Sequence, residues 1–341
     1  MAGPMTDSPD ASLPRVLSGM RPTGALHLGH YHGALKNWLR LQDTHDCFFF
    51  VADWHALTTA RPQDRAQLER HVYDMVVDWL AAGIDPERAT LFIQSRMPEH
   101  AELFTLLAMS TPLTWLERMP SFKDLAARSP DSASYGMLGY PLLQAADILI
   151  YRAAAVPVGE DQAAHVEVTR EVARRFNHLY GQGRPLLPEP QTLLTDTARI
   201  AGLDGRKMSK SHGNAIAMRE APAVTEEKIR TMPTDPQRAR RGDPGEPQRC
   251  PVWPLHELYS EDATLAWAAQ GCRSAGIGCL DCKQPLIQSI QAQQARWRER
   301  ADALLAEPKQ VHWIVEVGTE RARAVARKTL REVRAAMGLA Y

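Results

Sequence analysis

The chain has 341 residues, 44% of them apolar and 23% charged, and 40 Lys and Arg balance 40 Asp and Glu. This composition is typical of an ordinary globular protein with room for two domains. Zero net charge excludes a general basic field for binding nucleic acids such as DNA. No uninterrupted apolar run approaches the length that spans a membrane. Residues 1–13 lack a signal-peptide core, so we predict a disordered tail and a cytoplasmic protein with reduced or metal-bound cysteines.

The first predicted unit is a strand, a glycine-bearing turn and a helix. An apolar run at 14–17 leads through the turn into His27-Leu28-Gly29-His30, from which apolar residues recur at helical spacing. Free N–H groups and the helix dipole make such a turn suitable for an anion. His27 and His30 can face one ligand, and Gly29 permits close approach. A capping or surface role for the histidine pair stays open on this stretch alone.

The next elements indicate a parallel sheet. Residues 46–53 read as a buried strand, and residues 68–80 read as a helix. A second strand follows at 90–94, which predicts a doubly wound α/β fold. His55 directly follows the first of these strands and borders a ligand crevice or serves a structural role. Residues 98–139 read as an insertion of broken helices.

A buried carboxylate is predicted in the helical stretch Tyr140–Tyr151. Asp147 lies there among apolar residues, where a carboxylate needs a partner, and a cap or a buried salt bridge is the simpler alternative. Residues 153–158 read as the next strand, and Gly159-Glu160-Asp161-Gln162 opens a helix. Helix capping by Asp161 is the alternative to a binding role at this turn.

A basic loop follows at Lys207-Met208-Ser209-Lys210-Ser211. Small residues around two lysines suit a mobile lid that neutralises a polyphosphate, and a solvated basic turn is the alternative. Beyond this loop the sequence reads as helical, with long amphipathic helices predicted from Pro285 onward.

Four of the five cysteines fall at Cys250, Cys272, Cys279 and Cys282. Such a concentration in a cytosolic chain favours metal over disulfides, although only one C-x2-C pair is present, whereas a zinc site usually has two. Four buried or free thiols are the remaining alternative.

Together the histidine and lysine motifs resemble the HIGH and KMSKS motifs of class I aminoacyl-tRNA synthetases. With residues 18–24, 140–149 and 156–162, the chain looks like the bacterial tryptophanyl-tRNA synthetases from about Pro14 onward. This resemblance implies a Rossmann-like catalytic domain at 14–215, with the insertion around 98–139, and a helical anticodon-binding domain at 216–341. The last helix returns to the catalytic domain in that family, and the insertion contributes to a homodimer.

The resemblance also implies the reaction. Tryptophan is activated by ATP and Mg²⁺ to an adenylate and is then transferred to tRNA(Trp). The residues implied as catalytic are His27, His30, Lys207 and Lys210. Those implied for ATP are Arg21, Thr23, Gly29, His30, Gly159, Glu160, Asp161, Ile200, Lys207, Met208, Ser209, Lys210 and Ser211. Those implied for tryptophan are Asp147, which accepts the indole N–H, with His55, Tyr140, Gln144, Val156, Val158 and Gln162.

Two positions depart from the family pattern. His30 stands where Asn is more frequent, and both can donate a hydrogen bond. Gln144 stands where Met is usual, which places an amide in the apolar lining. The cysteine spacing resembles that of a subset of the family with a [4Fe-4S] cluster, with zinc as the alternative. The competing functions are tyrosyl-tRNA synthetase and a silent paralogue that binds tRNA or senses iron.

Overall fold

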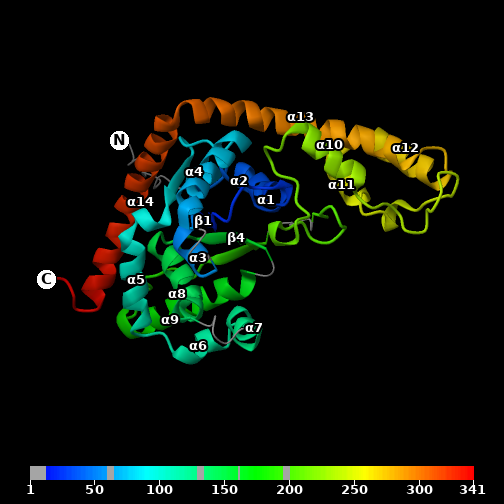
Figure 1. The fold of residues 1–341 in the computed structure, drawn as a ribbon. Helices are drawn as coiled ribbons and strands as arrows, with labels where there is room; N and C mark the ends of the chain where they lie inside the picture. The colour runs from blue at the N-terminus through cyan, green and yellow to red at the C-terminus, as the bar shows by residue number, and fades with distance from the viewer. Residues whose placement is uncertain (1–12, 60–64, 129–133, 160–161, 195–199) are drawn as a thin grey trace, which may run out of the picture.

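The computed structural model describes residues 13–59, 65–128, 134–159, 162–194 and 200–341. Its centre is a five-stranded parallel sheet with the order β3-β2-β1-β4-β5 (Figure 1). The strands are β1 (Arg15–Met20), β2 (Asp46–Val51), β3 (Ala89–Ile93), β4 (Ala155–Val158) and β5 (Gln191–Leu194). Helices cover both faces of the sheet, which confirms the predicted doubly wound α/β fold.

The central strands form because they are apolar on both faces. In β2 five of the six residues are buried, as expected for a parallel strand between two helical layers. β2 pairs with β1 in register from Arg15 opposite Asp46 to Met20 opposite Val51. Gly19 in β1 has no side chain because the Phe50 ring lies there, and a Cβ at Gly19 would stand 2.6 Å from that ring. The carboxyl ends of β1 and β2 thereby open onto an aromatic wall.

The first half of the chain supplies most of the layers around the sheet. Its helices are α1 (Leu28–His30), η1 (Tyr31–Leu35), α2 (Lys36–Leu41), α3 (Asp53–Leu57), α4 (Arg65–Ala82), η3 (Gln94–Arg96), α5 (Pro98–Ala108), α6 (Leu113–Glu117), α7 (Pro120–Arg128), α8 (Tyr135–Ile150) and α9 (Ala163–Tyr180). The stretch after the histidine motif, η1, is a π-helix rather than the regular helix predicted. π-helical turns are rare and concentrate at functional sites.

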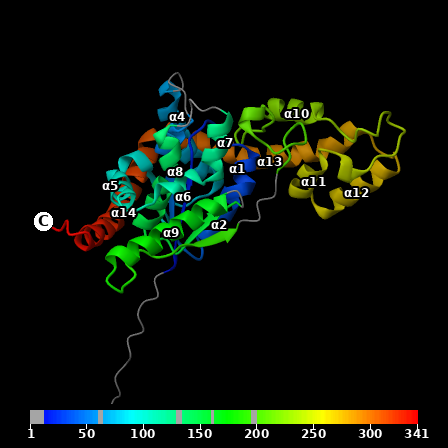
Figure 2. The same ribbon diagram turned by 90° about the horizontal axis from the view of Figure 1, so that it is seen from below.

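The second half extends away from the sheet and then returns to it (Figures 1 and 2). Its helices are η6 (Lys210–His212), α10 (Pro222–Thr231), η7 (Pro247–Arg249), α11 (Trp253–Tyr259), α12 (Asp262–Arg273), α13 (Cys279–Ala306) and α14 (Pro308–Ala336). The long α13 contacts α10, α11 and α12 and also packs on α4. α14 packs against α5 and the edge strand β3, where Gly318 allows the helix to lie against the Leu91 backbone.

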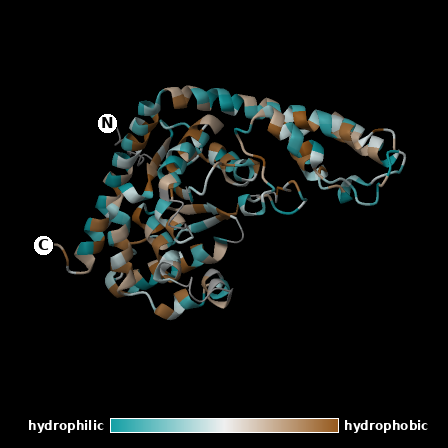
Figure 3. Ribbon diagram, in the orientation of Figure 1, coloured by the Kyte–Doolittle hydropathy of each residue, from teal (hydrophilic) through white to brown (hydrophobic). Residues whose placement is uncertain are grey.

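The core has one cluster on each face of the sheet. One includes Trp38, Phe49 and Trp79, with Trp38 stacked on Phe49 at a centroid distance of 4.2 Å. The other joins Phe92 and Tyr151 to helices α5, α8, α9 and α14. Apolar residues gather in the sheet and its covering helices, whereas α13 and α14 alternate apolar with hydrophilic residues (Figure 3). No described helix is long and apolar enough to cross a membrane.

Several boundaries differ from the predicted ones. Strand β5 was not predicted, and its half-exposed residues explain why its apolar pattern is weak. α8 begins at Tyr135, five residues before the predicted start, and α13 begins at Cys279 rather than Pro285. The tail predicted at 1–13 lies almost wholly outside the described residues, which begin at Leu13.

Candidate active site and four-cysteine cavity

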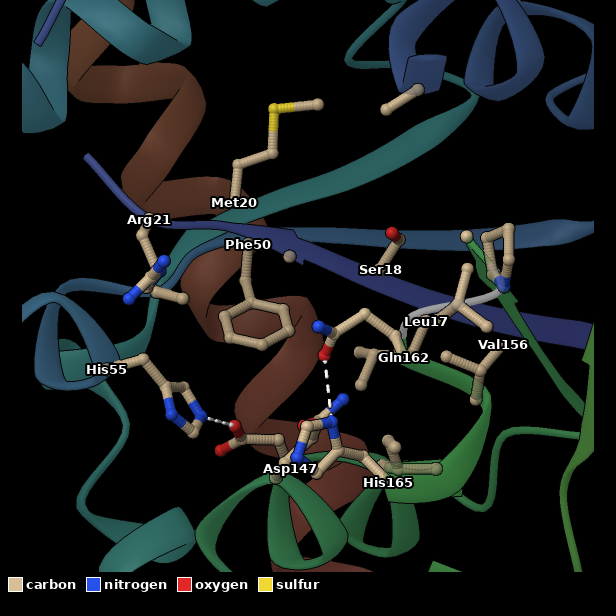
Figure 4. A pocket seen from close by; sticks show the side chains of 18 of the residues that line it. Leu17, Ser18, Met20, Arg21, Phe50, His55, Asp147, Val156, Gln162 and His165 are labelled. Atoms are coloured by element: carbon tan, nitrogen blue, oxygen red, sulfur yellow. Dashed lines mark hydrogen bonds and ion pairs between the residues drawn. The ribbon is translucent and has the colours of Figure 1, made fainter. Parts of the chain in front are cut away.

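The main cavity opens at the carboxyl ends of β1 and β4, the edge where parallel sheets bind ligands. Its volume is about 430 Å³. Leu17, Phe50 and Val156 form part of an apolar wall, and Arg21 lies at one side (Figure 4). The structure brings together in this cavity all seven residues predicted for the amino acid: His55, Tyr140, Gln144, Asp147, Val156, Val158 and Gln162. Arg21 and Gly159, predicted for ATP, line the same cavity.

Asp147 is fully buried and lies at the centre of a hydrogen-bond network. His55 Nε2 donates to its Oδ2 at 2.7 Å, and His100 Nδ1 donates to its Oδ1 at 2.6 Å. Gln94 Nε2 lies 3.0 Å from both carboxylate oxygens. Burial alone raises the pKa of the Asp147 carboxyl, but the bonds from His100 and His55 outweigh it and hold the pKa below its usual value. The carboxylate is therefore a buried, ionised acceptor.

Sequence reasoning missed three members of this network: Gln94, His100 and Tyr151. The Tyr151 hydroxyl lies 2.6 Å from His100 Nε2, and burial raises its pKa well above the usual value, so the phenol remains a donor. Gln94 stands just after β3, and the strand-end rule that singled out His55 would have found it. His100 and Tyr151 carried no local signal, since one lies in a helix and the other just after one.

The two motif histidines begin the helical segment after the turn. His27 is its N-cap, and its backbone N–H donates to His30 Nδ1 at 3.2 Å. The centroids of the two imidazole rings lie 3.8 Å apart. Burial and the Lys210 charge lower the pKa of His27 to about 4, and burial with the neighbouring His27 and Lys210 lowers that of His30 well below its usual value. Both imidazoles are therefore neutral at pH 7.

Only one of the two motif lysines reaches the histidine turn. Lys210 Nζ donates to the Gly24 carbonyl at 2.8 Å and lies 3.4 Å from Thr23 Oγ1, also predicted for ATP. Burial lowers its pKa to about 8, against an opposing effect of Asp78. The Lys207 side chain is exposed. The structure thus joins Lys210, but not Lys207, to the first motif.

Hydrogen bonds to the backbone fold the lysine loop against its surroundings. The Met208 N–H donates to the Ile200 carbonyl at 2.8 Å, and the Ser209 N–H donates to Asn214 Oδ1 at 2.8 Å. Ser209 and Ser211 pair through their hydroxyls at 2.9 Å. A Cβ at Gly29 would stand 3.6 Å from Met208, so this loop lies directly over the histidine turn. The predicted ATP residues Glu160 and Asp161 lie outside the described residues.

The four predicted metal ligands line one small cavity far along the chain from this site. Cys250 follows η7, Cys272 lies in α12, and Cys279 and Cys282 lie in the first turn of α13. Burial raises the pKa of the Cys250, Cys272 and Cys282 thiols, that of Cys282 to about 12. Within the described ranges, no group of three or more His, Cys, Asp or Glu side chains is arranged to hold a metal ion.

Cationic and polar side chains border the cysteine cavity. Arg238 Nη1 lies 4.0 Å from Cys272 Sγ, and His256 Nε2 lies 3.4 Å from Cys282 Sγ. Lys283 is buried at the cavity and donates to the carbonyls of Arg230 and Met232 at 2.8 and 2.6 Å. The Arg238 charge lowers the pKa of the Cys272 and Cys282 thiols, but burial outweighs it, so this charge offsets only part of the cost of forming the thiolates that bind metal.

Comparison with known proteins yields consistent matches. Residues 11–293 match the family described as class I tRNA synthetases (W and Y). The tryptophan–tRNA ligase of Ralstonia nicotianae is 52% identical, covering 96% of this chain and 99% of that protein. That of Thermotoga maritima is 47% identical, covering 96% and 100%. The crystal structure of the Campylobacter jejuni tryptophanyl-tRNA synthetase with ADP and tryptophan has a TM-score of 0.87 at 32% identity, covering 95% of this chain and 100% of that one.

Proposed function

We infer from these matches that the chain belongs to the class I tRNA synthetases for tryptophan and tyrosine, and that it is a tryptophan–tRNA ligase. It joins L-tryptophan to ATP as tryptophanyl-adenylate, with release of pyrophosphate. It then transfers tryptophan to the 3′ end of tRNA(Trp), with release of AMP. We propose a cytoplasmic enzyme, since translation uses these substrates there.

The observation that carries the choice of amino acid is a buried, ionised acceptor, the one carboxylate among the described residues that line the cavity. Indole offers one N–H donor and no acceptor, so the buried Asp147 carboxylate matches it. We assign the indole N–H to Asp147 and the apolar wall to the ring faces. A phenol also donates one hydrogen bond, so tyrosine is the competing substrate.

Amino-acid-dependent exchange of pyrophosphate into ATP tests this function. We expect exchange with tryptophan at least about a hundredfold more efficient than with tyrosine, because a misplaced polar group in a buried site is costly. Preference for tyrosine would identify a tyrosyl-tRNA synthetase. No exchange with either amino acid from folded protein would identify a silent paralogue.

The first step needs positioning and charge stabilisation rather than a general base, because the substrate carboxylate is already ionised. We place the phosphates of ATP over Gly29, between the neutral His27 and His30 and the loop of Lys210. Each neutral imidazole can donate one hydrogen bond to a phosphate oxygen. Lys207 and Lys210 close over the departing pyrophosphate, whose charge the Mg²⁺ bound to ATP shares.

The rest of the nucleotide site keeps the roles that the resemblance implies. Gly159 lines the cavity after β4, and we assign it to the ribose together with Glu160 and Asp161. Ile200 borders the lysine loop through its bond with Met208, and we assign its backbone to the adenine. Arg21 and Thr23 complete the phosphate side, and Ser209 and Ser211 complete the loop.

We propose that Cys250, Cys272, Cys279 and Cys282 hold a [4Fe-4S] cluster. Four sulfurs from three separate segments line one cavity, with Arg238 and Lys283 beside it, which fits an anionic group bound by four thiolates. The single C-x2-C pair makes a zinc ion the less suitable occupant. Bound there, the cluster supplies a rigid centre to the helical region and a redox-active group.

We also propose that residues 216–341 bind the tRNA anticodon and that the chain forms a homodimer. Large apolar side chains are exposed at neighbouring helices of the predicted insertion: Met109 is 72% exposed, Leu113 55% and Tyr135 71%. These helices contact one another through α8, so they offer one surface to a second copy. Sedimentation of the protein at micromolar concentration distinguishes a dimer from a 38.0 kDa monomer.

A further inference from the structure

Asp147 is held by two histidines that differ in how firmly the protein fixes them. His100 is fully buried, does not line the cavity, and is bound at both ring nitrogens, to Asp147 and to Tyr151. Since an ionised carboxylate only accepts, His100 Nδ1 carries the hydrogen that faces it, and the Tyr151 hydroxyl donates to Nε2. The ring therefore cannot turn without breaking two short hydrogen bonds inside the core.

His55 is fixed on one side only. Its Nε2 donates to Asp147, whereas its Nδ1 is buried with no hydrogen-bond partner among the described residues. Its ring lines the cavity and meets Tyr140 edge to face, at a centroid distance of 5.0 Å. It lies in α3, a five-residue helix that follows β2, and points from the cavity wall toward Asp147 (Figure 4). Among the described residues, the bond to Asp147 is the one hydrogen bond of this ring, beside its packing against Tyr140.

We propose that tryptophan binds by exchange: the indole N–H takes the place of His55 Nε2 on Asp147, while His100 and Tyr151 hold the carboxylate still. This inference rests on the proposed function and explains how the site selects tryptophan. Asp147 already accepts from His55, His100 and Gln94 and is fully buried in the free protein, so a new donor can reach its oxygens only if a neighbouring side chain gives way. His55 is the donor that both faces the cavity and has the fewest bonds to lose.

The exchange explains how a site can reject aromatic rings that lack a donor. A ring that displaces His55 without offering an N–H leaves Oδ2 of the buried carboxylate with only the Gln94 amide, which is shared with Oδ1. Losing this hydrogen bond costs far more than losing an apolar contact, because no water reaches the buried carboxylate to replace the donor. Tryptophan restores the bond that it breaks, whereas an aromatic ring without a donor does not. Both histidines are thus positioning residues for Asp147: on binding of tryptophan, His55 leaves the carboxylate and His100 stays bonded to it.

Proton NMR of the full-length wild-type protein tests the exchange directly. Imidazole N–H groups bound to a carboxylate resonate downfield of the amides, and the His55 and His100 signals are assigned by their absence in His55→Ala and His100→Asn. We expect saturating tryptophan to abolish or shift the His55 signal and to leave the His100 signal in place. Persistence of the His55 signal at its original position, or loss of the His100 signal instead, would overturn the proposal.

Kinetics with a matched substrate pair give an independent test. The benzothiophene isostere of tryptophan keeps the ring shape and replaces the N–H by sulfur, so the ratio of the two specificity constants isolates the donor. We expect His100→Phe to narrow this ratio by about tenfold or more, and Tyr151→Phe by about threefold. His100→Asn keeps a donor at the Nδ1 position and should restore most of the ratio.

His55→Ala provides the contrast. His55 is absent from Asp147 in both bound complexes, so its removal should change both specificity constants by one factor and leave their ratio within about threefold of wild type. An equal decrease of this ratio in His55→Ala and His100→Phe would overturn the proposed donor exchange. If His100→Phe does not fold, the ratios in His100→Asn and Tyr151→Phe and the wild-type spectrum test the proposal instead.

Tryptophan-dependent pyrophosphate exchange by the wild-type enzyme is measured first, because its absence would refute the proposed function rather than this mechanism.

Discussion

The two buried clusters of reactive side chains in this chain are satisfied in different ways. Around Asp147 the protein supplies every partner, since three side chains donate to one carboxylate. Around the four cysteines the side-chain contacts of the sulfurs among the described residues are long, 3.4 Å to His256 and 4.0 Å to Arg238, and Cys250 also accepts from the backbone of Val252 and Asp235. In the proposed exchange the first cluster gives up a bond to bind its ligand, whereas the second gains bonds when it is filled.

This difference has a thermodynamic meaning. A preorganised, fully paired site discriminates strongly but contributes a smaller net affinity, because each new bond replaces an existing one. An incompletely paired site contributes stability when filled, because ligand binding is then coupled to folding. The lysine loop lies between these cases: Lys210 is paired, but with a backbone carbonyl that a phosphate oxygen readily replaces.

The largest expected effect tests the incompletely paired cluster. Anaerobically purified wild-type protein should be brown, with about four irons and four sulfides per chain. Cys279→Ser should reduce iron to less than about one per chain and should impair tRNA charging more than adenylation, since the cluster lies in the helical region. Metal analysis and the two assays measure this. Stoichiometric zinc without iron would refute the cluster, and equal loss of both activities would show that it supports the whole fold.

The second effect tests the loop. Lys210→Ala should lower the rate of adenylation by about 10²–10³-fold and change tryptophan affinity much less, because the charge acts as pyrophosphate separates. Pre-steady-state adenylation measures the rate, and equilibrium binding of tryptophan provides the comparison. Lys207→Ala is the comparison variant: its side chain is exposed in this structure and has to move farther to act, so we expect a smaller loss of rate than in Lys210→Ala. An unchanged adenylation rate in Lys210→Ala would remove the lysine from the transition state.

The third effect tests the fully paired cluster. Asp147→Ala removes the acceptor for the indole N–H, so the specificity constant for tryptophan should fall by about tenfold to several hundredfold. Phenylalanine has no donor at that place and should lose little, so discrimination between the two amino acids should narrow. Pyrophosphate exchange with each amino acid measures both. Asp147→Asn, which keeps one acceptor oxygen, should retain part of the preference; equal use of tryptophan by wild type and Asp147→Ala would exclude Asp147 as the acceptor.

The smallest effect tests the lowered pKa of Lys210. Its pKa is lowered to about 8, so the free enzyme loses this charge as the pH rises through 8. Because the cation is the active form, kcat/KM for ATP should fall by about fivefold between pH 8 and pH 9. Lys210→Arg stays charged over this range and should remove that alkaline limb. A wild-type profile flat to pH 9.5 would contradict the assignment.

The sequence predicted the fold well because its strands are unusually explicit. β2 is apolar on both faces, and the alternation of strands with helices leaves few topologies. β5 was missed because a half-exposed edge strand of four residues has no such pattern. The predicted helix start at Pro285 was wrong, because α13 begins six residues earlier, at Cys279. Proline is tolerated there because the first turns of a helix need fewer backbone N–H donors than its middle.

The site was predictable where a residue stands at the end of a strand or inside a known motif. Asp147 and His55 were found in that way, but the donor that fixes Asp147 was not. His100 reaches it from another helix across 47 positions of the chain, a meeting that only the packing of α5 on α8 creates. The cysteine spacing predicted that the four sulfurs gather but not that two of them begin a 28-residue helix.

The close contact between Gly318 and the Leu91 backbone has a consequence for the order of synthesis. β3 is an edge strand, and α14 covers it, but Gly318 is translated roughly 200 residues after Leu91. At about 5–20 residues per second, the nascent chain carries an uncovered apolar edge for roughly 10 to 40 s. An exposed edge strand is a template for pairing with another chain. Misassembly is therefore a hazard of the growing chain that the finished protein no longer shows.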